Sequence, residues 1–172
     1  MTYSPLVGSL VLIPNQVQQG DSIPDIDLYE YSPGNKVNLA KELAVGKDVI
    51  KAFQQLFPGC SDYHVPGYIN SNQLKDAGGA FVVSVHEAFV MKAWGKSLDE
   101  PKSSGIRFLT DPAGAFTHAW DVELEAARTC GNNRSKRSAV LTENGKISKT
   151  SVEPDGTGIS SLAFPTICSE ER

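Results

Sequence analysis

The feature that most constrains the fold is a change of hydrophobic period near the middle of the chain. Residues 80–85 read AFVVSV, a nearly continuous apolar run of strand length. Such a run is typical of a central strand buried on both faces. The apolar residues that follow recur at helical spacing and predict a helix with an ordinary core face, made of Phe89, Val90, Ala93 and Trp94. A buried strand that leads into a helix is the building unit of α/β folds.

The rest of the chain continues this alternation of short strands and helices. Asn144-Gly145 is a strong hairpin signal and predicts a pair of antiparallel strands around it. The expected strands are 26–28, 49–53, 80–85, 106–109, 138–141 and 146–152. The expected helices are 38–44, one that begins near residue 60, 89–98, 115–120 and a short last helix before Pro165. This order predicts a three-layer α/β domain around a mixed sheet.

Length and composition indicate one folded domain. A chain of 172 residues with 40% hydrophobic and 21% charged residues is neither disordered nor a coiled coil. We expect residues 1–18 to form a loosely attached arm, because prolines and a glycine interrupt them, and residues 19–172 to form the domain. The 16 basic and 20 acidic residues give a net charge of -4, which disfavours a nucleic-acid partner.

Targeting signals in the N-terminal region are weak. Its longest apolar stretch, residues 6–13, is far shorter than the roughly 20 residues that span a bilayer. No Lys or Arg precedes this stretch, whereas a secretory signal begins with a basic region. The sequence therefore favours the cytoplasm, without a membrane partner and without a clear mitochondrial or peroxisomal signal.

Cys60 is the strongest candidate for a reactive group. The three cysteines are too few for a disulfide framework. Cys60 follows the turn Phe57-Pro58-Gly59 and should lie in the first turn of a helix, where free amides and the helix dipole favour an anion. That position can lower the thiol pKa from about 8.5 towards neutrality. The competing interpretation is a small buried apolar residue, the commoner place of a free cysteine.

Two further features could complete a site around Cys60. His64 follows four residues later, one helical turn on, and could belong to the site, form half of a metal site, or simply cap or pack. The sequence holds no second ligand pair with zinc spacing, so we expect no metal. The basic cluster 134–137 (RSKR) is a solvated face, unless one of its arginines points inward at the thiolate.

Many ordered segments of the chain match the landmarks of one family. They are 20–24 (GDSIP), 33–39 (PGNKVNL), 58–60 (PGC), 64–68 (HVPGY), 88–91 (AFVM) with Trp94-Gly95, 111–116 (DPAGAF), 134–137 (RSKR) and 152–158 (VEPDGTG). Over nearly all of 20–167 the chain resembles the peroxiredoxins, specifically the type-5 (atypical two-cysteine) class. The resemblance implies a thioredoxin-like three-layer α/β/α fold with a central mixed β-sheet.

The resemblance also implies a thiol-dependent peroxidase that reduces hydrogen peroxide and alkyl hydroperoxides. Cys60 corresponds to the peroxidatic cysteine, whose thiolate attacks a peroxide oxygen and becomes a sulfenic acid. Arg137 corresponds to the arginine that holds the thiolate and the peroxide. Pro58 corresponds to the proline that shields the cysteine, and His64 and Arg134 are the expected supporting residues. The electron donor would be thioredoxin or another dithiol, and no metal or organic cofactor is implied.

The segment before the nucleophile departs from the family pattern Pro-Gly-Ala-Phe-Thr-Pro-x-Cys. Residues 54–60 read QQLFPGC, so the threonine is absent. Its hydroxyl normally hydrogen-bonds the peroxide, and losing one such donor would lower the rate on the order of 10²–10³-fold. Ser61 or a backbone amide is a candidate replacement. The stretch 68–85 is also shorter than usual, which should shorten the helix that carries Cys60 or the loop after it.

The usual resolving cysteine is also missing. Residues 159–161 (ISS) occupy its place, and serine forms no disulfide. Cys168 and Cys130 are possible resolving residues if their Cα atoms come within about 7 Å of that of Cys60. Otherwise an external thiol resolves the sulfenic acid in a one-cysteine mechanism.

These departures leave three hypotheses. The first is a thiol peroxidase that acts through Cys60 and Arg137, with a homodimer as its possible assembly. The second is a non-catalytic or weakly active paralogue of the same fold, which acts as a binding or redox-sensor module. The third is a redox switch in which Cys60 and Cys168 pair.

Overall fold

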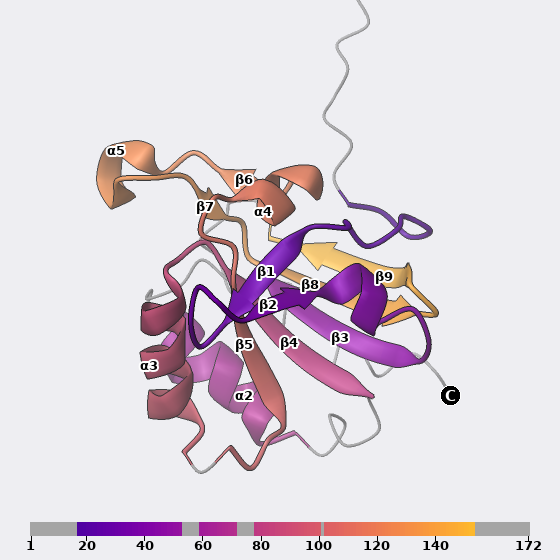
Figure 1. Ribbon diagram of the computed structural model, residues 1–172, viewed down its shortest axis with the longest axis horizontal. Helices are drawn as coiled ribbons and strands as arrows, with labels where there is room; N and C mark the ends of the chain where they lie inside the picture. Colours follow the sequence, from indigo (N-terminus) through magenta and orange to yellow (C-terminus); the bar gives the residue numbers. More distant parts are fainter. Residues whose placement is uncertain (1–16, 53–58, 72–77, 101, 154–172) are drawn as a thin grey trace, which may run out of the picture.

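The computed structural model describes residues 17–52, 59–71, 78–100 and 102–153. Its main sheet contains strands β1 (Asp27–Glu30), β2 (Lys36–Asn38), β3 (Lys47–Ala52), β4 (Gly79–Ser84), β5 (Ile106–Thr110), β8 (Ser138–Glu143) and β9 (Lys146–Val152). They lie in the order β2-β1-β5-β4-β3-β8-β9 (Figure 1). Strands β3, β4 and β5 run parallel, and the other neighbours run antiparallel. The predicted mixed sheet is confirmed.

The helices and a second small sheet flank this sheet. The helical elements are α1 (Leu39–Glu42), η1 (Cys60–His64), α2 (Val65–Ile69), α3 (Ala88–Leu98), α4 (Ala115–Ala119) and α5 (Ala127–Cys130). Strands β6 (Glu123–Leu124) and β7 (Arg134–Ser135) pair with each other in a two-stranded sheet.

Alternation along the central strands separates two apolar cores. In β4, Phe81 and Val83 belong to the core that contains Phe116 of α4. Val82 belongs to the other core, which η1, α2, α3 and β5 line together with Cys60. Figure 1 shows α2 and α3 together beside β5. Because successive side chains of a strand point to opposite faces, one buried strand serves both cores, and the three-layer α/β/α architecture is confirmed.

The β8–β9 hairpin follows directly from its turn residues. Asn144 and Gly145 have φ angles of 51° and 77°, the left-handed pair that a tight two-residue hairpin requires. The register pairs Glu143 with Lys146, and on the other side β8 pairs with β3, so that Ser138 lies opposite Ala52. The hairpin therefore fixes where the residues before β8 lie relative to the end of β3.

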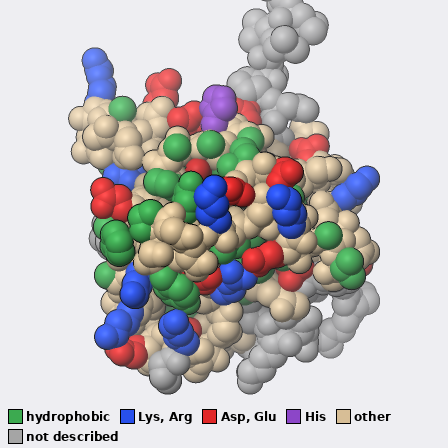
Figure 2. All heavy atoms as spheres, in the orientation of Figure 1, with side chains coloured by type: hydrophobic (Ala, Val, Ile, Leu, Met, Phe, Trp, Pro, Cys, Tyr) green, Lys and Arg blue, Asp and Glu red, His purple; other side chains and the backbone are tan. Residues whose placement is uncertain are grey.

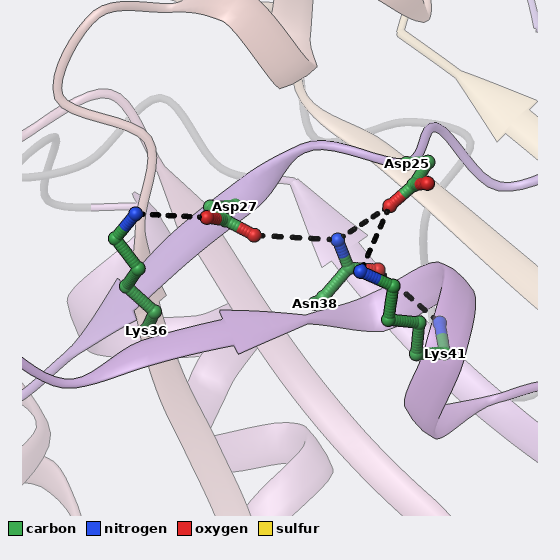
Figure 3. A network of polar contacts seen from close by, with 5 residues as sticks. All are labelled: Asp25, Asp27, Lys36, Asn38 and Lys41. Carbon is green, nitrogen blue, oxygen red and sulfur yellow. Dashed lines mark hydrogen bonds and ion pairs between the residues drawn. The ribbon is translucent and has the colours of Figure 1, made fainter.

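A network of polar contacts lies beside the edge strand β2 and its neighbour β1 (Figure 3). Lys36 contacts the Asp27 carboxylate at 3.1 Å, and the Asn38 amide donates to Asp25 at 2.7 Å. Asn38 also caps α1 by accepting from the backbone N–H of Lys41 at 3.2 Å. In Figure 2 basic and acidic side chains are interspersed on this face, as expected for a solvated edge.

The predicted core face of α3 is partly wrong. Phe89 is 62% exposed and Ala93 is exposed, whereas the buried residues are Ala88, Met91, Trp94 and Gly95. A close approach of α3 to β5 turns the small residues inward, because a Cβ on Gly95 would lie 2.8 Å from the Phe108 ring. The pattern did not predict β2, β6, β7 or α5, and the last predicted helix lies outside the described residues.

None of the helices in the described part of the chain has the length and apolar character that crossing a membrane requires.

Candidate functional site

The site lies where the parallel strands end. Ala52, the last residue of β3, pairs with Ser138, the first residue of β8. Arg137 directly precedes Ser138, so the basic cluster returns to the edge of the sheet at which β3 ends and the chain leads on to Cys60. His86 follows β4 at the same edge. Ligand and catalytic groups gather at the carboxyl ends of parallel strands in α/β folds.

Cys60 begins the helix that follows β3, as the sequence predicted. Its carbonyl accepts from the Val65 N–H, an i→i+5 bond, so η1 is a π-helical turn that continues into α2. Pro66 explains this widening, because a proline cannot donate to the carbonyl four residues earlier and its ring crowds that turn. Gly59 occupies the N-cap position and has no side chain that could cap the first turn.

The Cys60 thiol is fully buried among apolar side chains. Its exposed fraction is 0%, and it packs in the cluster that contains Val65, Tyr68 and Met91. Burial raises the pKa of the thiol, and the charge and hydrogen bond of Arg137 act against that rise. The expected fall of the pKa at a helix start is therefore not observed, because desolvation of the thiolate outweighs the favourable charges.

Arg137 is the inward-pointing member of the basic cluster. It is 1% exposed, and its guanidinium acts on Cys60 by charge and hydrogen bonding, which lowers the pKa of that thiol. Its carbonyl accepts from the N–H of Glu153 at 2.9 Å, which ties the backbone to the end of β9. A buried guanidinium stays charged, so it provides a fixed positive charge beside the sulfur.

Arg134 lies near this site but binds the backbone instead. Its guanidinium donates to the carbonyl of Val85 at 2.6 Å and to that of Cys130 at 3.1 Å. It also donates to Nε2 of His86 at 2.8 Å. Burial and the charge of Arg134 lower the pKa of His86 to about 4, so this imidazole is neutral. Arg134 thereby connects β7 and α5 to the loop after β4.

Of the other predicted site residues, the structure describes His64 and Cys130 but not Pro58 and Cys168. His64 is buried at the end of η1, 7% exposed, one turn from Cys60. Cys130 ends α5 and is partly exposed, and both described cysteines carry free thiols. Pro58 and Cys168 lie outside the described residues.

Sequence reasoning missed two contacts around the site. The indole N–H of Trp94 donates to Oγ of Ser61 at 3.0 Å, and Arg134 meets His86. These partners are separated by 33 and 48 positions, so no local spacing indicates the pairs. The place of His86 directly after a buried strand was the one usable signal.

The described residues contain no cluster of three or more His, Cys, Asp and Glu side chains that could hold a metal ion. His118, far along the chain, instead contacts Glu123 through Nδ1 at 3.0 Å, and this carboxylate raises the pKa of His118.

Comparisons with known proteins show which family the chain belongs to. The profile of the Redoxin family matches residues 18–163. Peroxisomal membrane associated protein 20 of Schizosaccharomyces pombe is 39% identical over 147 residues, which cover 83% of this chain and 92% of that protein. Peroxiredoxin-2C of Oryza sativa subsp. japonica is 37% identical over 150 residues, which cover 81% of this chain and 90% of that protein.

Solved structures give the same result. Peroxiredoxin 5 from Alvinella pompejana superimposes with a TM-score of 0.73 at 34% identity, over 81% of this chain and 91% of that chain. Reduced Prx3 from Vibrio vulnificus, in complex with hydrogen peroxide, gives a TM-score of 0.77 at 32% identity, over 88% of this chain and 97% of that chain. Family profile, relatives and structures together show that the chain belongs to the peroxiredoxins, in their type-5 class, and is an enzyme of this family of thiol peroxidases.

Proposed function

We propose that the protein reduces hydrogen peroxide and alkyl hydroperoxides with Cys60 as the peroxidatic residue. The observation that carries this proposal is the buried guanidinium of Arg137, whose charge acts on the Cys60 thiol and lowers its pKa. A fixed cation beside the sulfur favours the thiolate, which is the nucleophilic form. The similarity to a Vibrio Prx3 described in complex with hydrogen peroxide supports a peroxide as the substrate.

In the proposed reaction the Cys60 thiolate attacks the nearer oxygen of the peroxide. The S–O bond forms as the O–O bond breaks, and the departing oxygen leaves as water or an alcohol after it takes up a proton. Arg137 stabilises the thiolate first and then the negative charge that develops on the departing oxygen. The sulfur is oxidised to a sulfenic acid, and Pro58 and His64 would shield and support it.

Reduction of the sulfenic acid closes the cycle. A thiol attacks the sulfenic sulfur, water leaves, and a second thiol releases Cys60 from the disulfide. We propose thioredoxin or another dithiol protein as the reductant in a one-cysteine mechanism. Cys130 and Cys168 are the two internal thiols that could replace the first external one. Mass spectrometry of the peroxide-treated protein distinguishes an internal disulfide from a mixed one.

The decisive experiment is thiol-dependent peroxide consumption by the Cys60→Ser variant. We expect no consumption above the background rate, because the serine hydroxyl is not ionised at neutral pH. Cys130→Ser is the matched control and should keep the first, peroxide-reducing step of a single turnover. A Cys60→Ser variant as active as the wild type would overturn the proposal.

A second candidate function is a binding or redox-sensor module with little turnover. The buried Cys60 thiol with its raised pKa favours this alternative, together with the absence of the family threonine. The second-order rate constant of Cys60 with hydrogen peroxide separates the two. A value equal to that of a free thiol supports the module, and a value orders of magnitude higher supports the peroxidase.

Compartment and assembly are separate proposals. We expect the cytoplasm, although one relative is named for association with the peroxisomal membrane, and immunofluorescence distinguishes the two.

We also propose a homodimer, because Tyr63 and Phe89 are 69% and 62% exposed, and an interface would cover such apolar side chains. Sedimentation equilibrium gives the oligomeric state.

A further inference from the structure

The indole of Trp94 has a fixed position in the core beneath the Cys60 helix. It is 6% exposed and meets the Phe108 ring edge to face, with the ring centroids 5.7 Å apart. The next residue, Gly95, leaves no room between α3 and β5, because a Cβ there would lie 2.8 Å from the Phe108 ring. The close contact between α3 and β5 therefore sets where the indole N–H points.

That N–H points at the residue directly after Cys60. The indole donates to Oγ of Ser61 at 3.0 Å, across 33 positions of sequence. Ser61 is partly buried and lies in the first turn of η1. Within the described ranges no side chain caps the start of this helix, and its widened turn lacks ordinary α-helical bonding. The hydrogen bond from Trp94 is thus a tertiary contact that holds the first turn of η1, where the N-cap position makes no side-chain hydrogen bond.

We propose that Trp94, through its hydrogen bond to Ser61, is a positioning residue that holds the first turn of η1 so that the Cys60 sulfur stays against Arg137. Arg137, which precedes β8, acts on the Cys60 thiol by its charge, and Trp94 of α3 binds the adjacent residue. Two anchors on neighbouring residues fix both the place and the rotation of the turn. The predicted effect on peroxide rate rests on the proposed function, whereas the predicted effect on the thiol does not.

The arrangement also assigns Ser61 a role other than that of the missing family threonine. Its oxygen accepts from the indole, so the side chain faces the core formed by α3 and β5. Loss of the hydroxyl should therefore act first on the Cys60–Arg137 contact and only through it on peroxide.

The test measures the thiol itself. The rate of Cys60 alkylation by iodoacetamide is followed from pH 6 to 10, with peptide mass spectrometry to read Cys60 alone. Ser61→Ala and Trp94→Phe both remove the bond, and Trp94→Phe keeps an aromatic ring in the core. We expect both variants to show a higher Cys60 pKa than the wild type and about a fivefold lower peroxide rate, the factor that one neutral hydrogen bond is worth.

Two controls isolate the bond. Ser61→Thr keeps the hydroxyl and should restore the wild-type alkylation profile. Ser97→Ala removes another hydroxyl that contacts Trp94, through a bond of 2.7 Å to its backbone carbonyl within α3, and should leave the profile unchanged. The double variant with Ser61→Ala and Trp94→Phe should shift the profile no further than either single change.

The outcomes separate this inference from the proposed function. An unchanged Cys60 profile in Ser61→Ala would overturn the inference, as would an equal shift in Ser97→Ala. A lower peroxide rate with an unchanged profile would also overturn it, because Ser61 would then act on the peroxide directly. A wild type that consumes no peroxide, with the expected profile shift in the variants, would overturn the function and support the inference.

Discussion

Burial and the Arg137 guanidinium shift the pKa of the Cys60 thiol in opposite directions. Burial of the thiol raises its pKa, and the guanidinium, by charge and hydrogen bond, lowers it. We expect Arg137→Met to raise the Cys60 pKa further, because desolvation then acts alone. It should also lower the peroxide rate at pH 7 by on the order of 10²-fold, the usual cost of removing one charge-stabilising group from an active site. The pH profiles of alkylation and of peroxide reduction measure both effects.

Arg134→Met is the matched control for this variant. Arg134 binds two backbone carbonyls and His86 rather than the sulfur, so its loss should lower the free energy of unfolding and leave the Cys60 pKa in place. If both arginine variants shifted the Cys60 profile equally, the effect of Arg137 would be general loss of structure and not its charge.

At the residue scale the sequence could predict that Arg137 pairs with Cys60, but not the other contacts around them. Cys60 and Arg137 lie in segments that match family landmarks, and the structure brings them together as expected. The Trp94–Ser61 bond depends on where α3 lies over β5, which no local pattern specifies. The direction of the Cys60 pKa was also beyond the sequence, because it depends on how completely the core desolvates the sulfur.

The position of α3 on β5 is an element-scale property that one glycine controls. A Cβ on Gly95 would lie 2.8 Å and 2.9 Å from two carbon atoms of the Phe108 ring, and that ring also packs against Trp94. We expect Gly95→Ala to lower the free energy of unfolding by about 1–3 kcal/mol, the usual range for an overpacked core. Urea unfolding followed by circular dichroism measures it.

Gly67 provides the opposite case within a helix. It lies in α2 and is exposed, and no atom of the described residues lies within 4 Å of the place that an alanine Cβ would take. Gly67→Ala should therefore raise the free energy of unfolding by up to about 1 kcal/mol, because alanine is the better helix former. Equal effects of the two substitutions would show that α3 can move away from β5 without loss.

Strong periodicity explains which elements the sequence predicted. The apolar run of β4 and the Asn144-Gly145 hairpin carry unambiguous signals, and both are where they were expected. Strands of two or three residues, such as β6 and β2, are too short to show a period. In α3 the periodicity located the helix but not its buried face, because Phe89 fits the spacing yet lies in solvent.

At the scale of the whole molecule, polar contacts join the small β6–β7 sheet to the main sheet. Arg134 in β7 makes such a tie, to the loop after β4 that contains Val85 and His86. The bond to His86 requires a neutral imidazole, because only an unprotonated Nε2 can accept from a guanidinium, whereas the bond to the Val85 carbonyl does not. Protonation of one imidazole should therefore weaken the connection between the two sheets.

The free energy of unfolding should consequently depend on the protonation of His86. Its folded-state pKa is about 4, below the ordinary 6.5 of the unfolded chain, so the unfolded state binds more protons between these values. Stability from this group is full above pH 6.5 and is lost as the pH falls towards 4, by on the order of 1–3 kcal/mol. Asp48, whose pKa burial raises, acts in the opposite direction. The comparison that isolates His86 is therefore wild type against His86→Gln, by urea unfolding at several pH values.

His86→Gln keeps an acceptor for Arg134 but does not titrate, so the stability difference between wild type and variant should shrink or reverse in favour of the variant between pH 6.5 and 4. His118→Gln is the control, because His118 is an exposed imidazole whose pKa Glu123 raises. Its stabilising effect is present below pH 6.5 and is lost only as the pH rises through that raised value, which lies outside the window. Parallel curves for wild type and His86→Gln from pH 6.5 to 4 would show that protonation reaches His86 without breaking the Arg134 tie, and that the two sheets do not depend on it.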